Sequence, residues 1–208
     1  METKTERTFS AFAGHKCVVS GDVNATIAGV MRYLAKHEGE NVLVFEDRTG
    51  KQIDFDLRGT VDEAIARLAE HPSFAAPKDE GPRGPGRPKL GVVSREISLL
   101  PRHWEWLESQ PEGTSGALRR LVEEARRRGQ GKQIARAARE AAGKAMWSLA
   151  GDLPHFEEAS RALYARDQEK LTGLIKRWPK DVKAYVERLV AEAVRLEAIA
   201  AAEAGAPA

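Results

Sequence analysis

Residues 41–57, NVLVFEDRTGKQIDFDL, hold the pattern that decides the fold class. An apolar run and a run of alternating residues flank the segment DRTG, whose composition is typical of a tight turn. The alternation puts three apolar side chains on one face of the second run: Ile53, Phe55 and Leu57. The stretch therefore predicts an antiparallel pair of strands, over 41–46 and 52–57, with one buried face.

The residues around this pair complete a small α+β unit. Before it we expect two short strands and then a helix that Asp22 caps, over 8–13, 16–20 and 23–37. After it, Gly59-Thr60 precedes a second helical pattern. These elements give the order ββαββα, and we assign residues 1–74 to one α+β domain.

The segment that follows, AAPKDEGPRGPGRPKLG at 75–91, has a different composition. It is rich in Pro and Gly and has almost nothing apolar to bury, so we expect an extended or disordered linker. Its core, Gly86-Arg87-Pro88, resembles an AT-hook, in which an extended Arg-Pro segment lies in the minor groove of A·T-rich DNA. The match is partial, because no Arg directly follows Pro88. A hinge with incidental charge is the alternative reading.

Charge is unevenly distributed along the chain. The whole chain has 33 basic and 31 acidic residues, a net charge of +2. Residues 1–80 hold 10 basic and 14 acidic residues, whereas residues 81–144 hold 14 and 7. A basic middle part between acidic ends favours a polyanion partner for the middle, although an arginine-rich helical surface would give the same count.

Residues 92–130 resemble a ribbon-helix-helix domain. VVSREISLL at 92–100 alternates like a strand, Pro101 suits the first turn of a helix, and Thr114 or Ser115 is placed to cap a second helix. In that family two chains pair their strands into a ribbon that enters the major groove of DNA. The resemblance therefore implies a homodimer, and it implies that the start of the second helix contacts a phosphate.

These resemblances assign the candidate DNA-binding residues. The minor-groove segment is Arg83, Arg87, Pro88 and Lys89. Arg95 is the ribbon residue placed to meet a base edge, and Thr114 and Ser115 would meet phosphate. Phosphate neutralisation falls to the basic residues of the following helices: Arg119, Arg120, Arg126, Arg127, Arg128, Lys132, Arg136 and Arg139. The sequence departs from the basic ribbon expected of such a DNA-binding domain, because neither face of the 92–100 strand is uniformly basic. Ile97 and Leu99 share a face with Arg95, and Glu96 lies on the other face.

The remaining residues predict a helical bundle over 131–202 and a frayed tail over 203–208. Gly129-Gln130-Gly131 predicts a break between helices. The next helix has an apolar stripe of Ile134, Ala138, Ala142, Ala145 and Leu149. Asp167 and Asp181 are placed to cap two later helices.

Residues of catalytic type give little support to an enzyme. His15 and Cys17 would lie on one side of a hairpin without a third group to orient them, and Asp47, Asp54 and Asp56 are explained by a turn and a solvated strand face. We expect no catalytic residues, metal or cofactor. The chain has a polar start and no apolar run long enough to span a membrane, so we expect a cytoplasmic protein with no membrane partner.

Four phrases together resemble one bacterial family, catalogued as domain of unknown function 2239. They are FAGHKCVVSGD, VLVFEDRTGKQIDFDLRGT, GRPKLGVVSREISLLPRHWEWLESQPEGTSGALRRLVEEAR and AGDLPHFEEASRALYARD. The resemblance brings no activity. From the residues we expect a dimeric DNA-binding protein, a transcriptional regulator or nucleoid-associated factor, whose N- or C-terminal domain takes a protein partner. A protein–protein adaptor that binds no DNA is the alternative.

Overall fold

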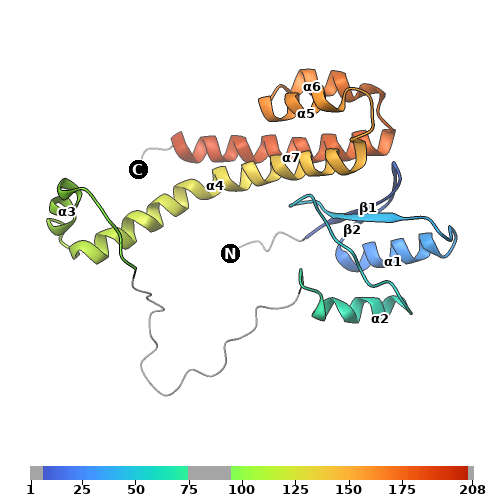
Figure 1. The fold of residues 1–208 in the computed structure, drawn as a ribbon, viewed down its shortest axis with the longest axis horizontal. Coiled ribbons are helices and arrows are strands. Elements are labelled where there is room, and N and C mark those ends of the chain that lie inside the picture. Colours follow the sequence, from blue (N-terminus) through green and yellow to red (C-terminus); the bar gives the residue numbers. More distant parts are fainter. Residues whose placement is uncertain (1–6, 75–94, 206–208) are drawn as a thin grey trace, which may run out of the picture.

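The α+β class expected from the sequence is confirmed. A computed structural model describes residues 7–74 and 95–205 of the chain. A small antiparallel sheet forms from the N-terminal part, and a largely helical region follows it (Figure 1). Of the side chains in the long helices, those at 127–128 and 203–205 lie outside the description.

The sheet has four strands in the spatial order β2-β1-β3-β4, and each neighbouring pair is antiparallel. The strands are β1 (Phe9–Ala13), β2 (Lys16–Gly21), β3 (Val42–Glu46) and β4 (Lys51–Gln52). Helix α1 (Val23–Leu34) follows the first hairpin and α2 (Val61–Ala66) follows the second. The expected order ββαββα is therefore confirmed.

Strand β4 is shorter than expected. The sequence predicted a strand through Leu57, but ladder pairing ends after Gln52, and Ile53 makes one further bond by donating its N–H to the Val44 carbonyl over 2.8 Å. Beyond this point the chain leaves the edge of the sheet. Ile53, Phe55 and Leu57 still pack on one apolar cluster, so the face was predicted correctly while the strand was not.

Both helices of the N-terminal part begin at the caps that the sequence indicated. The Asp22 carboxylate accepts the N–H of Ala25 over 2.8 Å. Thr60 and Glu63 form a reciprocal capping box at the start of α2. These local hydrogen bonds satisfy N–H groups that have no partner within the helix.

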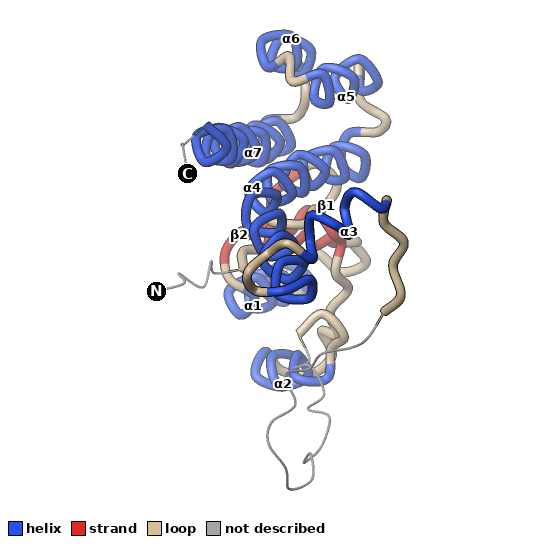
Figure 2. Tube along the Cα trace, turned by 90° about the vertical axis from the view of Figure 1, so that its left-hand side faces the viewer, coloured by secondary structure: helices blue, strands red, loops and turns tan. Residues whose placement is uncertain are grey.

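The sheet has a core on each face. On one side Phe9, Ala11 and Val44 pack with Val30 of α1. On the other side Phe12 and Phe45 join the helical region, because successive side chains of a strand point to opposite faces. Figure 2 shows the resulting layers, with α1 on one side of the strands and α4 and α7 on the other.

Helix α4 (Gly113–Ala150) runs without interruption through the residues at which a break was expected. The prediction of a break at Gly129-Gln130-Gly131 is wrong. Each glycine in a helix interior costs only about 1 kcal/mol relative to alanine, and strong helix formers surround Gly129 and Gly131. Packing of the C-terminal half of α4 against α7 supplies the compensating stability.

The other helices surround this long pair. The pair consists of α4 and α7 (Lys180–Gly205), and the others are α3 (Pro101–Glu108), α5 (Phe156–Ala165) and α6 (Gln168–Leu174), with single 3-10 turns at Arg67–Glu70 and Ile175–Arg177. Asp167 caps α6 as expected, by accepting the N–H of Lys170 over 3.0 Å. Asp181 does not cap α7: the helix begins at Lys180, and Asp181 accepts the backbone N–H of Cys17 over 3.0 Å.

The buried stripe of α4 differs in part from the expected one. Ala142, Ala145 and Leu149 are buried, but Ala138 is only half-buried and Ile134 is 45% exposed.

Across residues 7–74 and 95–205, no helix combines the length and the apolar character that crossing a membrane requires.

Candidate functional site

Helix α3 and residues 113–131 of α4 form a projection that we call the helical arm. Figure 1 shows it extending past the end of α7, away from the sheet. Leu107 of α3 and Ala117 of α4 are buried where the two helices meet. Most of the predicted DNA-binding residues that the structure describes lie on this arm.

The ribbon strand expected over 92–100 is not formed in residues 95–100, which are irregular. Arg95 is exposed there. A strand needs a partner for its backbone N–H and C=O groups, and among the described residues none of the four strands pairs with this segment. The four predicted minor-groove residues lie outside the described residues: Arg83, Arg87, Pro88 and Lys89.

The start of α4 also differs from expectation. Thr114 and Ser115 do not cap the helix; they lie inside its first turn, and Glu112 occupies the N-cap position without a side-chain hydrogen bond. The reason is Gly113, whose φ of 69° makes the reversal after α3, so that the helix begins one residue before Thr114. The backbone N–H groups of Thr114 and Ser115 remain in the first turn, where a helix can receive an anion.

Basic side chains are exposed along the arm and at its base, and several pair with acidic neighbours. Arg120 donates to Glu112 over 2.7 Å, and this hydrogen bond raises the pKa of Arg120 and lowers that of Glu112. Arg126 lies 3.3 Å from Glu123. The predicted phosphate-binding residues that are exposed are Arg119, Arg120, Arg126, Lys132 and Arg136; the side chains of Arg127 and Arg128 are not described. Exposed pairs of this kind are weak, about 0–1 kcal/mol, so they can be exchanged for a phosphate.

Arg139 is the exception among these basic residues. It is buried, and its guanidinium pairs with both carboxylate oxygens of Glu197 at 2.8 Å and donates to the Leu163 carbonyl over 2.7 Å. Its prediction as a phosphate contact is wrong, because the turn of α4 that carries it packs against α5 and α7.

The arm also carries an uncovered apolar stripe. Ala117 of α4 is buried against α3, but Val122 is 64% exposed and Leu121 is 36% exposed. Trp106 of α3 is 48% exposed, and Ile97 and Leu100 just before α3 are each 50% exposed. Large apolar side chains that are exposed on one projection are typical of an interaction surface.

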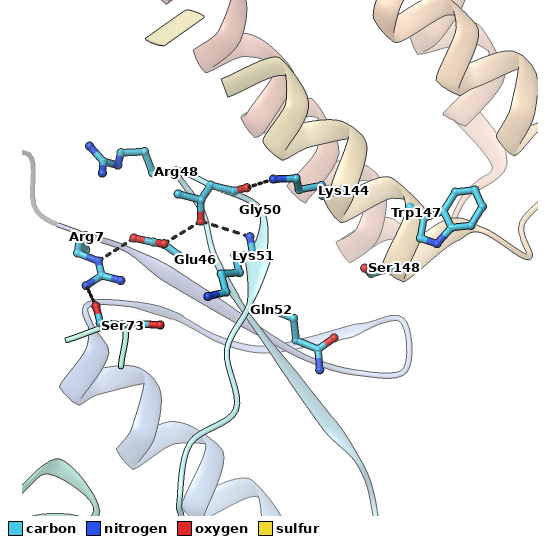
Figure 3. Close-up of a pocket in the computed structure, with 11 residues that line it drawn as sticks. Arg7, Glu46, Arg48, Gly50, Lys51, Gln52, Ser73, Lys144, Trp147 and Ser148 are labelled. Atoms are coloured by element: carbon cyan, nitrogen blue, oxygen red, sulfur yellow. Dashed lines mark hydrogen bonds and ion pairs between the residues drawn. The ribbon is translucent and has the colours of Figure 1, made fainter. Parts of the chain in front are cut away.

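A second candidate site lies where the β3–β4 turn meets α4. We call it the hairpin pocket; its volume is about 730 Å³, and its charged and aromatic lining consists of Arg7, Glu46, Arg48, Lys51, Lys144 and Trp147. In Figure 3 Lys144 reaches from α4 to the turn, where its Nζ lies 3.5 Å from the Thr49 carbonyl oxygen. Sequence reasoning missed this site: it recognised the turn but had no signal to bring a helix residue so distant in the sequence to it.

The acidic member of the pocket is already neutralised. Glu46 is buried, and its two carboxylate oxygens accept from Arg7 Nε and Thr49 Oγ1, each over 2.7 Å (Figure 3). Arg7 also donates to the Ser73 carbonyl. Among the described residues, no carboxylate lies within ion-pair distance of Arg48, Lys51 or Lys144, so the pocket has an excess of positive charge.

The residues of catalytic type are not brought together. His15 lies 3.8 Å from Asp152, whereas the Cys17 thiol turns to the Val19 carbonyl. Burial, followed by the charge of Asp181, raises the pKa of Cys17, which opposes a nucleophilic role.

The three aspartates considered for a cation also lie apart. Asp47 is buried against α7 and accepts from Arg188, while Asp56 bonds Arg58, which holds its pKa well below the usual range. Asp54 is exposed and accepts from Gln52. Within 7–74 and 95–205, no three His, Cys, Asp or Glu side chains are arranged to hold a metal ion.

Fold and surface together define an α+β protein with a projecting helical arm and a cationic pocket. Residues 8–190 match the family described as an uncharacterised protein conserved in bacteria, DUF2239, and the chain belongs to this family. No curated protein and no solved structure is significantly similar to it.

Proposed function

We propose that the chain is a dimeric DNA-binding protein, acting as a transcriptional regulator or nucleoid-associated factor. The observation that carries the proposal is the combination, on one projecting arm, of an uncovered apolar stripe and exposed arginines. The apolar stripe offers a surface for a second copy of the arm, and the arginines offer charge to phosphates.

A second copy would also explain the irregular segment before α3. Residues 92–100 alternate like a strand, and in a ribbon-helix-helix arrangement the partner chain supplies the missing neighbour. The two arms would then cover Leu121 and Val122 of each copy. Arg95 would lie on the ribbon, and the helix start at Thr114 and Ser115 would receive a phosphate.

The linker would add a second contact. By its sequence, Gly86-Arg87-Pro88 can enter the minor groove of A·T-rich DNA, with Arg83 and Lys89 on either side. Tethering this segment to a folded reader raises its local concentration at the duplex, so two weak contacts can give a useful affinity.

Fluorescence anisotropy with A·T-rich and G·C-rich duplexes at several salt concentrations tests the DNA contacts. We expect salt-dependent binding with a preference for A·T-rich duplex, and loss of that preference in Arg87→Ala. Lys132→Gln should weaken binding to both duplexes and lower the slope of log K against log salt by about 1. Absence of binding at low salt would show that the DNA proposal is wrong.

Sedimentation velocity tests the dimer separately. Val122→Glu places a charge in the exposed stripe of the arm and should convert a dimer into a monomer. Tyr164→Glu is the matched control, because Tyr164 is exposed on α5 and does not belong to the arm. A wild-type chain that is monomeric at all concentrations would contradict the proposal.

The adaptor function is the second candidate. Pairing of Arg120 and Arg126 with neighbouring glutamates favours it, because these cations are already partly neutralised. An adaptor would keep the dimer and tolerate Arg87→Ala, while the same anisotropy titration would detect no duplex binding.

A further inference from the structure

The cations of the hairpin pocket come from two segments that are held together rigidly. Gly50 in the β3–β4 turn donates its N–H to the Glu46 carbonyl over 2.8 Å, and its Cα lies directly against the backbone of Ala141 in α4. The turn therefore has a fixed position relative to the helix turn that carries Lys144. A site whose groups are already in place loses little conformational entropy when a ligand binds.

The excess of positive charge in this pocket is unusual for its surroundings. Residues 1–80 hold 10 basic and 14 acidic residues, yet they contribute three basic side chains and one carboxylate to the pocket wall, and Lys144 of α4 adds a fourth cation. That carboxylate, Glu46, is buried and bonded to Arg7 and Thr49. Arg48, Lys51 and Lys144 thus line the pocket without a nearby compensating charge, and their mutual repulsion is relieved when an anion binds.

The donors present suit a phosphate group. Arginine offers a planar pair of N–H donors that matches two phosphate oxygens, and each lysine adds a compact positive charge. The bond from Lys144 to the Thr49 carbonyl is long, at 3.5 Å, so it can be given up for a stronger, charge-assisted bond. On the rim, Trp147 is 73% exposed and borders the pocket.

We propose that the hairpin pocket binds the phosphate group of a small phosphorylated molecule through Arg48, Lys51 and Lys144. The pocket is a recess between the turn and α4, of about 730 Å³, which is within the usual range of roughly 300–1,000 Å³ for small-molecule sites. The backbone of DNA carries the same chemical group, and the test below separates the two sources. This site does not depend on the helical arm or on the DNA proposal.

Isothermal titration calorimetry of the full chain with pyrophosphate, and separately with ADP, tests the site. Arg48→Gln and Lys144→Gln should each weaken binding at least about tenfold, since each removes a charge-assisted hydrogen bond to the phosphate. Lys176→Gln is the matched control, because Lys176 is exposed on the 3-10 turn after α6 and should change the affinity by less than about twofold. All three positions are at the surface, and circular dichroism checks that each variant folds.

Three results would overturn the proposal. The first is that neither probe releases heat with the wild-type chain. The second is that Lys176→Gln weakens binding as much as Lys144→Gln, which would indicate a general charge effect. In the third case the pocket variants would weaken duplex binding by anisotropy while leaving pyrophosphate binding unchanged, and the phosphate would then belong to DNA. Quenching of Trp147 fluorescence by ADP, removed in Trp147→Phe, is expected if the ligand occupies the recess.

Discussion

Tyr185 on α7 donates its hydroxyl proton to Asp47 at the end of β3 over 3.1 Å, and both residues are buried. The carboxylate of Asp47 also accepts from Thr8, Ser10 and Arg188, at 2.7, 2.9 and 3.1 Å. Burial, and then the charge of Asp47, raises the pKa of Tyr185, so its hydroxyl stays protonated and able to donate. This network joins the sheet to the final helix and makes the two parts one packed unit.

Tyr185→Phe should lower the free energy of unfolding by about 1–2 kcal/mol, because it removes one donor from a buried carboxylate and leaves the ring in place. Urea denaturation measures the change. Tyr164→Phe is the control: Tyr164 is 55% exposed, and its hydroxyl should matter by less than about 0.5 kcal/mol. Equal midpoints for wild type and Tyr185→Phe would mean that the bond to Asp47 contributes nothing.

Gly50→Ala should destabilise the protein by about 3 kcal/mol or more. Gly50 has a φ of 62°, which costs a non-glycine residue about 1–2 kcal/mol, and a Cβ would also lie 2.7 Å from the Ala141 Cα. Gly14→Ala isolates the first effect, since Gly14 has a φ of 55° and nothing within 4 Å of the added atom. The difference between the two variants in the free energy of unfolding, measured in urea, therefore reports the close approach of the turn to α4. Equal losses of stability in the two variants would contradict this close approach.

Features that depend on neighbouring residues could be predicted from the sequence. The caps at Asp22, Thr60 and Asp167 are local hydrogen bonds, and the alternation at Ile53 to Leu57 gave the correct buried face. Strand length was not predictable in this way, because β4 ends where the chain leaves the sheet, although β3 continues opposite it to Val42.

Features that depend on distant partners were missed or wrong. The ribbon strand was expected over 92–100, and its described residues, 95–100, are irregular. The break expected at 129–131 is overridden by the packing of α4 further along. The hairpin pocket could not be foreseen, because Arg48 and Lys144 are brought together only by the approach of the turn to the helix. For the same reason Arg139 was taken for a surface cation although it pairs with Glu197.

Glu197→Gln should destabilise the protein at neutral pH and have little effect in acid. The hydrogen bond from Arg139 lowers the pKa of Glu197, with a smaller contribution from the charge of Arg166. A carboxyl group whose pKa is lower when folded stabilises the fold above its unfolded pKa, and this contribution is lost as the pH falls through the folded pKa.

We therefore expect a loss of about 2 kcal/mol in Glu197→Gln near neutral pH, from one charged hydrogen-bonded pair. The difference from wild type should start to shrink as the pH falls below the ordinary glutamate value of 4.5. Urea titrations across this range measure it. Glu157→Gln is the control: it removes an exposed pair with Arg161 and should change the free energy of unfolding by less than about 0.5 kcal/mol at neutral and at acid pH. A loss in Glu197→Gln that does not depend on pH would contradict the role given to the Glu197 carboxylate.

Cys17 should react slowly with iodoacetamide in the folded chain. Its pKa is raised first by burial and then by the charge of Asp181, and the thiolate is the reactive form. Near pH 8 we expect alkylation at least about tenfold slower than for N-acetylcysteine, with the rates becoming similar in concentrated guanidinium chloride.

The pH dependence of that rate separates charge from simple shielding. Asp181→Asn removes the carboxylate next to Cys17 and should shift the alkylation profile toward lower pH, whereas Asp62→Asn, an exposed change on α2, should leave the profile in place. A different result is that both variants keep the wild-type midpoint of alkylation rate against pH and differ only in the plateau rate. Access to the thiol would then control its reactivity, and the electrostatic influence of Asp181 on Cys17 would be excluded.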